Sequence, residues 1–155
     1  MSPIAWRCDP FGELSPAELY ELLALRQRVF VVEQRCAYLD ADGWDAAAWH
    51  LAGRDAEQRL IAYARLFGPG VRYPGAAAIG RVASAPEVRG RGVGRALMAE
   101  SLRRVEERWG RATPVKLQAQ SYLLRFYREL GFEPVSEEYD EDGIPHLDMV
   151  RPGGR

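Results

Sequence analysis

The sequence predicts a domain of the mixed α+β class (α/β mixed), in which a largely antiparallel sheet is flanked by helices. The 155 residues are 47% hydrophobic, which suits one compact domain, so we expect residues 1–155 to form a single domain. Strand-like and helix-like segments alternate irregularly, with one helix-like segment between two strand-like ones near residue 100. Short connections favour antiparallel neighbours and a crossover helix favours a parallel pair, so a mixed sheet is expected.

The first helix has a well-marked start. A strand at residues 4–8 precedes Ser15-Pro16-Ala17-Glu18, which is a capping box with proline at the first helical position. Apolar residues then recur at helical spacing, with one arginine among them. These positions are Leu19, Leu22, Leu23, Arg26, Val29 and Phe30. We expect a helix that breaks near residues 26–29.

The middle of the chain predicts three strands. An acidic, turn-prone loop at residues 37–48 is followed by strand patterns at residues 49–54 and 60–67, which a short polar segment joins as a hairpin. Residues 76–85 are small and apolar, as in a strand that is buried on both faces.

The last third predicts two helices and three strands. A helix over residues 92–109 ends at Gly110, a strand follows at residues 114–120, and a short helix ends at Gly131. Residues 133–151 are predicted to form two strands around an acidic turn. The whole chain then has about seven strands and about four helices.

Charge and composition exclude several classes of function. The net charge of -1 argues against nucleic-acid binding, which needs an excess of Lys and Arg. No apolar run is long enough for a membrane span and the first residues lack a signal-peptide pattern, so we expect a cytoplasmic protein without membrane contacts. Cys8, Cys36, His50 and His146 lack metal-ligand spacing, so we predict no metal and two buried, apolar-type cysteines.

Residues 89–95 form a basic, glycine-rich loop at the start of the second helix. Their three glycines and three arginines suit an anion, because a helix start offers unpaired N–H groups. The dinucleotide fingerprint fails because its third glycine would be Arg95 or Leu97, and no P-loop is present. What remains is Arg89-x-x-Gly92-x-Gly94, for which a basic surface loop is the alternative interpretation.

This pattern resembles the acetyl-coenzyme A signature of the GCN5-related N-acetyltransferases (GNAT). The buried strand before it and the helix after it match the family, as does "RFYRELGF" with Tyr127, Gly131 and Phe132. The segments at residues 19–45 and 141–149 narrow the resemblance to the ElaA-like branch. One departure is Ser121-Tyr122, where that branch commonly has Ala-His.

The resemblance implies the GNAT fold and an acyltransferase that moves an acetyl group from acetyl-CoA to a primary amine, directly in a ternary complex. The acceptor would be a small-molecule or peptide amine, and family habit makes a homodimer one option. The implied coenzyme-binding residues are Arg81, Val82, Ala83, Arg89, Gly90, Arg91, Gly92, Val93, Gly94, Arg95 and Tyr127. Backbone N–H groups of residues 81–83 are also the implied oxyanion donors.

Two catalytic tasks call for side chains. The resemblance makes Tyr127 the acid for the thiolate, with a core aromatic as the alternative. For the base, Glu33 ends an apolar run where partial burial would raise its pKa, or it is a plain helix-end carboxylate near Arg35. His146 is the second candidate, or an edge-strand histidine with satisfied partners. Candidate acceptor contacts are Glu33, Gln34, Gln118, Gln120 and His146.

Two acidic clusters would attract a cationic amine, or are simply solvated turns. They are Asp40, Asp42 and Asp45, and Glu137, Glu138, Asp140, Glu141 and Asp142. His50 is expected to be packed or on the surface, and Cys36 lacks a neighbouring base. The competing functions are a non-catalytic module that binds coenzyme A or acyl-CoA, and an enzyme with a different acyl donor.

Overall fold

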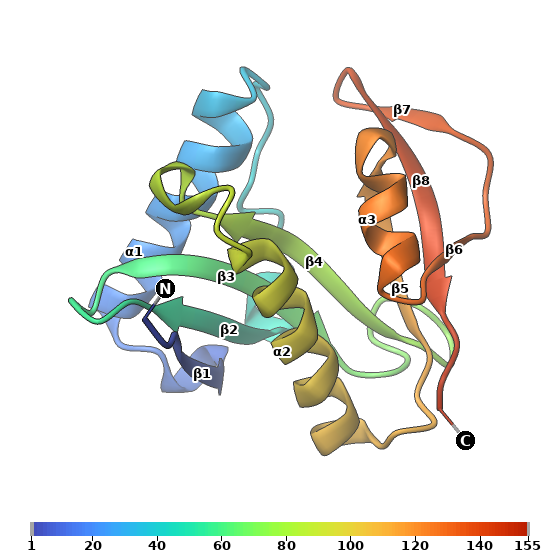
Figure 1. The fold of residues 1–155 in the computed structure, drawn as a ribbon, viewed down its shortest axis with the longest axis horizontal. Helices are drawn as coiled ribbons and strands as arrows, with labels where there is room; N and C mark the ends of the chain where they lie inside the picture. Colours follow the sequence, from blue (N-terminus) through green and yellow to red (C-terminus); the bar gives the residue numbers. More distant parts are fainter. Residues whose placement is uncertain (1, 155) are drawn as a thin grey trace.

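One eight-stranded sheet organises residues 2–154, the part of the chain that this computed structural model describes. The strand order is β1-β2-β3-β4-β5-β8-β6, with β7 also paired to β8 (Figure 1). Neighbours are antiparallel except β4 and β5, which are parallel because helix α2 crosses between them. The predicted mixed α+β class is therefore confirmed.

The bounds of the elements follow the predicted segments closely. The strands are β1 (Ala5–Pro10), β2 (Trp49–Arg54), β3 (Leu60–Phe67), β4 (Ala77–Ser84), β5 (Val115–Gln120), β6 (Glu133–Pro134), β7 (Tyr139–Glu141) and β8 (Ile144–Arg151). The helices are α1 (Pro16–Arg26), a π-helix (Gln27–Glu33), α2 (Val93–Trp109) and α3 (Leu124–Glu129). Helix α2 lies in front of the sheet in Figure 1 and α1 behind it.

Helix α1 begins as the capping box predicts. The Glu18 N–H donates to the Ser15 hydroxyl at 3.1 Å, and the Ser15 N–H donates to the Glu18 carboxylate at 2.9 Å. The predicted break after Arg26 takes the form of the π-helix, a widened turn that is frequent at functional sites. Arg26, the one charged residue of the apolar face, is fully buried.

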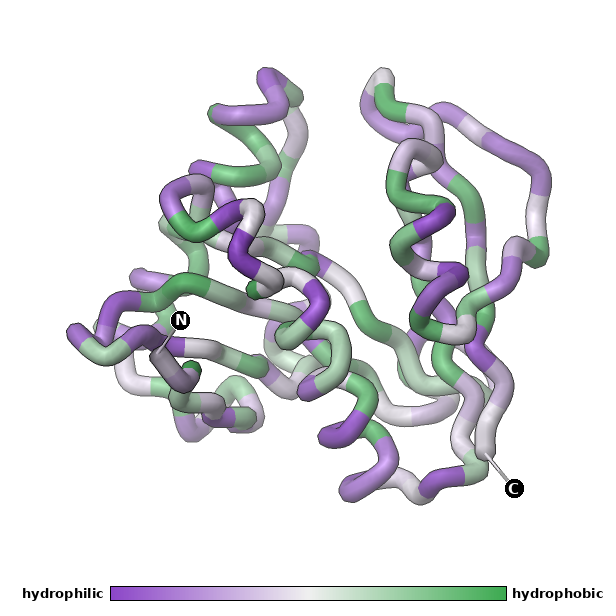
Figure 2. Tube along the Cα trace, in the orientation of Figure 1, coloured by the Kyte–Doolittle hydropathy of each residue, from purple (hydrophilic) through white to green (hydrophobic). Residues whose placement is uncertain are grey.

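The core lies on both faces of the central strands. In β3 every residue after Leu60 is buried, and Figure 2 shows this strand as a largely hydrophobic run. Met98, Leu102 and Val105 of α2 close one face, and Leu22 and Leu25 of α1 close the other. None of the helices within residues 2–154 is both long and apolar enough to cross a membrane.

The C-terminal region corrects the prediction of two strands. Strand β8 is long enough to pair in succession with β6, at Val150 and Met149, and with β7, at residues 144–146. The chain between β6 and β7 leaves the sheet, because it is mostly polar (Figure 2). The Asp148 N–H of β8 donates to the Ser136 hydroxyl there in place of a strand carbonyl. The described residues therefore contain eight strands rather than about seven.

The sheet opens between β4 and β5. The parallel pair is registered at Ala77–Val115 and Ala78–Lys116, and the two strands diverge beyond these positions (Figure 1). Strand β5 continues its pairing with β8 as far as Gln120–His146. The molecule therefore divides into two arms with an opening between them.

Candidate functional site

A cleft of about 750 Å³ occupies the opening between the two arms. It brings together most of the residues that the sequence predicts for the site. Those that line it are Glu33, Gln34, Arg81, Val82, Ala83, Arg89, Gly90, Gly92, Val93, Gly94, Gln118, Gln120, Tyr127 and His146. Arg91 and Arg95 are not among the lining residues, and Arg95 instead pairs with Glu129 of α3 at 2.6 Å.

The glycine-rich loop forms an open cradle at the start of α2. Gly90 and Gly92 have φ angles of 79° and 80°, which favour glycine, and a Cβ added at either would meet nothing within 4 Å. The first helical bond runs from the Ala96 N–H to the Gly92 carbonyl at 3.0 Å, so the N–H groups just before it have no helical partner. This geometry suits a phosphate group at the cleft wall.

Glu33 lies beside this loop rather than in an apolar environment. Its carboxylate forms an ion pair with Arg89 at 2.6 Å, and its side chain is 37% exposed. The expectation of partial burial was therefore wrong, because the π-helix ends at Glu33 and points its side chain across the cleft toward the loop. Its role as a base stays a prediction.

Strand β4 carries a bulge where the arms diverge. Tyr63 of β3 pairs with Ala83 and Arg65 pairs with Gly80, so β4 contains one extra residue in this interval. Arg81 lies in the bulge with a φ of 50°, an uncommon value for a residue other than glycine. Arg81 and Val82 have no partner residue in β3 or in β5.

Tyr127 borders the cleft from α3 and is also packed among aromatic rings. It is 6% exposed, with ring centroids 5.1 Å from Phe126 and 5.9 Å from Phe132. Burial raises the pKa of its phenol to about 12. The hydroxyl therefore stays protonated at neutral pH and is able to donate a proton.

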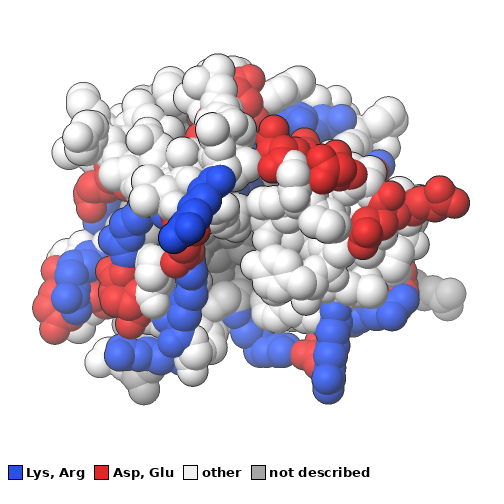
Figure 3. Space-filling model, turned by 90° about the horizontal axis from the view of Figure 1, so that it is seen from above, with Lys and Arg blue, Asp and Glu red and all other residues white. Residues whose placement is uncertain are grey.

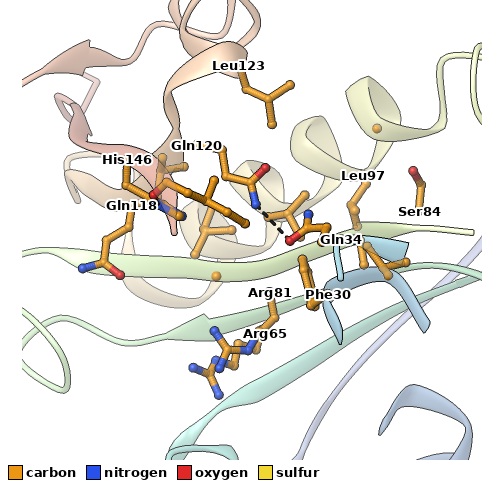
Figure 4. A pocket seen from close by; sticks show the side chains of 18 of the residues that line it. Phe30, Gln34, Arg65, Arg81, Ser84, Leu97, Gln118, Gln120, Leu123 and His146 are labelled. Carbon is orange, nitrogen blue, oxygen red and sulfur yellow. Dashed lines mark hydrogen bonds between the residues drawn. The ribbon is translucent and has the colours of Figure 1, made fainter. Parts of the chain in front are cut away.

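The opposite wall of the cleft holds His146, Gln118 and Gln120 (Figure 4). The His146 Nδ1 lies 2.7 Å from the Ile144 carbonyl oxygen, which only accepts, so Nδ1 carries a hydrogen and Nε2 is the acceptor in the neutral ring. Gln120, paired with His146 across β5 and β8, donates to the Gln34 amide oxygen at 3.3 Å. Gln34 therefore orients Gln120 from across the cleft.

The acidic loop before β2 is neutralised by arginines that sequence reasoning did not connect to it. Arg26 pairs with Asp40 at 2.9 Å and with Asp45 at 2.7 Å. Arg65 pairs with Asp42 at 2.6 Å and with Asp45 at 3.0 Å. All three carboxylates are paired with arginines, and Asp40 is buried, whereas Asp42 stays exposed and lines the cleft, so this cluster is neither a simple solvated turn nor a set of unpaired carboxylates. The signal was Arg26 itself, a charge on an apolar helix face.

The pKa values of this cluster agree with its pairing. Burial acts to raise the pKa of Asp42, but hydrogen bonds from Arg65 and from the Trp44 N–H outweigh burial and hold it well below its usual range. At Asp45, burial also acts to raise the pKa, but hydrogen bonds and ion pairs with Arg26 and Arg65 outweigh burial, and the pKa is lowered. Both groups stay charged at neutral pH and are too weakly basic to accept a proton from an amine.

The remaining candidates have structural partners. His50 is buried, with Nδ1 2.6 Å from the Tyr63 hydroxyl and Nε2 2.9 Å from the Asp45 carbonyl oxygen, which confirms a packed histidine. Cys36 is buried and Cys8 is half-buried. Among residues 2–154, no three His, Cys, Asp or Glu side chains gather into a group that could hold a metal ion.

Comparisons with known proteins agree with this geometry. A family model described as an acetyltransferase (GNAT) domain matches residues 45–151. The chain is 43% identical over 150 residues to protein ElaA of Escherichia coli, covering 96% of each chain. It is 44% identical over 147 residues to a UPF0039 protein of Synechocystis, covering 95% of this chain and 94% of the relative. An acyl-CoA N-acyltransferase structure from Pseudomonas aeruginosa superposes with a TM-score of 0.90 at 44% identity, covering 96% of this chain and 99% of that one.

Proposed function

This chain belongs to the GNAT acetyltransferase family, with relatives named ElaA and UPF0039, and we propose that it transfers the acetyl group of acetyl-CoA directly to a primary amine. One observation carries the proposal. The open glycine cradle at the start of α2 faces the same cleft as the bulge of β4 and the phenol of Tyr127. A phosphate site, unpaired backbone and a proton donor therefore border one space.

The donor would bind along β4 and the glycine-rich loop. The N–H groups at residues 92–95 would hold the pyrophosphate, with Arg89, which is paired with Glu33 at 2.6 Å, at the edge of the cradle. The divergence of β4 from β5 leaves backbone N–H and carbonyl groups of β4 without strand partners, and these suit the amide groups of the pantetheine arm. The thioester would then lie near the bulge, where backbone N–H groups of residues 81–83 can donate to its oxygen.

Proton transfer would involve Tyr127 and His146. His146 accepts a proton from the acceptor ammonium at Nε2, since Nδ1 is held by the Ile144 carbonyl. The free amine attacks the thioester carbon, the C–S bond breaks with the electron pair leaving on sulfur, and the nitrogen releases its second proton to water, so that a neutral amide forms. Tyr127, which burial keeps protonated, gives its proton to the thiolate and recovers one from water. Glu33 remains the second candidate for the base, although its ion pair with Arg89 favours a role on the donor side.

The acceptor would enter from the side of the β7–β8 hairpin. Glu141 and Asp142 line the cleft there, and Figure 3 shows acidic side chains gathered beside the central hollow. Among the described residues, no ion pair involves the five carboxylates of residues 137–142. Gln118 and Gln120 on the adjoining wall would orient a protonated amine. A small-molecule amine and a peptide amine both fit these features.

Thiol release from acetyl-CoA with a panel of amines tests the proposal. We expect turnover with at least one amine, and a 10²–10³-fold loss of kcat in Tyr127→Phe because the thiolate loses its acid. Gly92→Glu should abolish acetyl-CoA binding by placing a carboxylate in the cradle. Gly110→Glu is the matched control, since Gly110 also has positive φ and open space but lies at the far end of α2. Tight binding of acetyl-CoA without turnover of any amine would instead support a regulatory module.

A further inference from the structure

Arg81 has an unusual conformation for its place in the fold. Among residues 2–154, the other non-glycine residues with positive φ are Arg35, Gln58 and Asp142, all in turns or loops. Arg81 alone of these lies within a strand, where the pairing of β4 with β3 is interrupted between Gly80 and Ala83, beyond the last pair with β5 at Ala78. A left-handed backbone costs free energy at any residue with a Cβ, so surrounding contacts must hold it in place.

The side chain of Arg81 supplies those contacts. Its Nε lies 2.8 Å from the Asp40 carboxylate, and its Nη2 lies 3.1 Å from the Asp40 carbonyl oxygen and 3.3 Å from the Asp42 carboxylate. Its guanidinium also lies over the Tyr38 ring, 5.4 Å from the centroid. The charge of Arg81 is therefore already compensated, which argues against its use as an anion receptor in the cleft.

Asp40 is held in turn from the interior. It is 4% exposed, and Arg26, which is fully buried, donates from Nε to its second carboxylate oxygen at 2.9 Å and from Nη2 to its carbonyl at 3.0 Å. The Tyr38 hydroxyl donates to the oxygen that faces Arg81, at 3.0 Å. Arg26, Asp40 and Arg81 thus form a chain from the last residue of α1 to the bulge of β4, which we call the bulge clamp.

We propose that the bulge clamp fixes the backbone of Arg81 and Val82 so that its N–H groups point at the thioester oxygen, which makes Arg26, Asp40 and Arg81 positioning residues for acetyl transfer. The inference rests on the proposed function, because it assigns these N–H groups to the acetyl carbonyl. It adds that residues on α1 and on the acidic loop determine the geometry of the oxyanion site, although neither Arg26 nor Asp40 lines the cleft. The clamp acts through the backbone, and its side chains do not touch the reacting atoms.

A pair of substitutions separates positioning from direct participation. Arg81→Ala removes the clamp and leaves a Cβ in the left-handed conformation, so the bulge should relax and kcat should fall about 100-fold. Arg81→Gly also removes the clamp, but glycine adopts positive φ freely, so kcat should recover to within about 10-fold of the unaltered protein. The KM for acetyl-CoA should change by less than about 3-fold in both, since the pyrophosphate cradle is untouched. Gln58→Ala and Gln58→Gly, at a turn residue with φ of 64°, are the control pair.

A second measurement does not depend on turnover. The infrared band of a ¹³C-labelled acetyl carbonyl should shift to lower frequency when acetyl-CoA binds, lose that shift in Arg81→Ala and regain most of it in Arg81→Gly. Asp40→Asn should lower kcat in the native background and have a smaller effect in the Arg81→Gly background, where no clamp remains to be broken.

The alternative outcomes are distinct. Equal losses in Arg81→Ala and Arg81→Gly, or no loss in either, would overturn the inference. A protein that acetylates no amine, yet shows the carbonyl shift and its glycine recovery, would contradict the proposed function and support the clamp.

Discussion

The two acidic segments of this chain, residues 40–45 and 137–142, are similar in charge and opposite in structure. The carboxylates of the first are paired with Arg26, Arg65 and Arg81, and Asp40 is nearly inaccessible to solvent. Those of the second lie on and before the β7–β8 hairpin, without ion pairs among the described residues. Glu141 and Asp142 border the cleft, as does Asp42 of the first segment. The comparison shows that acidic composition alone does not identify an acceptor site. Whether an acidic segment is free to bind a cationic acceptor depends on whether the fold brings arginines to its carboxylates.

The arginines come from three separate elements. Arg26 ends α1, Arg65 lies in β3 and Arg81 lies in β4, so only the folded sheet brings them to one loop. The first segment is therefore engaged in ion pairs within the fold, and the second carries no ion pair among the described residues. Three predictions test this division, beginning with the largest effect.

Removing Arg26 should strongly destabilise the protein. Arg26→Met removes one of the two arginine partners of Asp40 and one of the two of Asp45, so charge inside the fold loses compensation and the free energy of unfolding should fall by about 3–5 kcal/mol. Denaturant titration measures this change. Glu138→Gln is the control on the other segment and should change the free energy of unfolding by less than about 0.5 kcal/mol. Equal effects of the two substitutions would contradict the division.

Acid should weaken the first segment in particular. The pKa values of Asp42 and Asp45 are lower in the folded protein than the usual value of about 3.9 in an unfolded chain. The contribution of these two carboxylates to the free energy of unfolding is complete above about pH 4. It is lost as the pH falls further, because their carboxylates in the unfolded chain take up protons before those in the folded protein, which favours unfolding. Unfolding measured between pH 5 and pH 2 should show a loss of the order of 1 kcal/mol that is smaller in Asp45→Asn. An identical pH dependence in the variant would show that the pairing does not contribute.

Neutralising the second segment should change acceptor binding and little else. Glu141→Gln and Asp142→Asn should raise the KM for a cationic amine by about 2- to 5-fold each and weaken its dependence on salt. The KM for acetyl-CoA should stay unchanged, because the proposal has the donor bind along β4, away from the hairpin. Steady-state kinetics at low and high ionic strength measure both quantities. An unchanged amine KM would remove the hairpin from the acceptor site.

Local patterns predicted most of the fold. The capping box at Ser15 and the hairpin of β2 and β3 depend on neighbouring residues, and the structure confirms both. The C-terminal region was harder, because the division of its pairing into β6 and β7 depends on the length of β8 and on a contact between Ser136 and Asp148. The family resemblance drawn from residues 89–95 and the "RFYRELGF" segment is confirmed by the GNAT match.

The site was predictable where sequence spacing sets geometry. The glycine cradle depends on consecutive residues, of which Arg89, Gly90, Gly92, Val93 and Gly94 line the cleft, and their binding of the coenzyme stays a prediction. The position of Glu33 was not predictable, since its partner Arg89 is brought to it by the packing of the π-helix beside the loop. The bulge at Arg81 was missed for a similar reason, because nothing local in "IGRVAS" distinguishes a bulged strand from a regular one.

The most direct test of the account is the ratio of acetylated amine formed to coenzyme A released, measured by mass spectrometry and thiol detection in one reaction. Direct transfer predicts a ratio of one for the unaltered protein, and product formation should cease in Gly92→Glu. Release of coenzyme A without acetylated amine would indicate hydrolysis of the thioester, and it would contradict the proposal that this cleft joins an amine to the acetyl group.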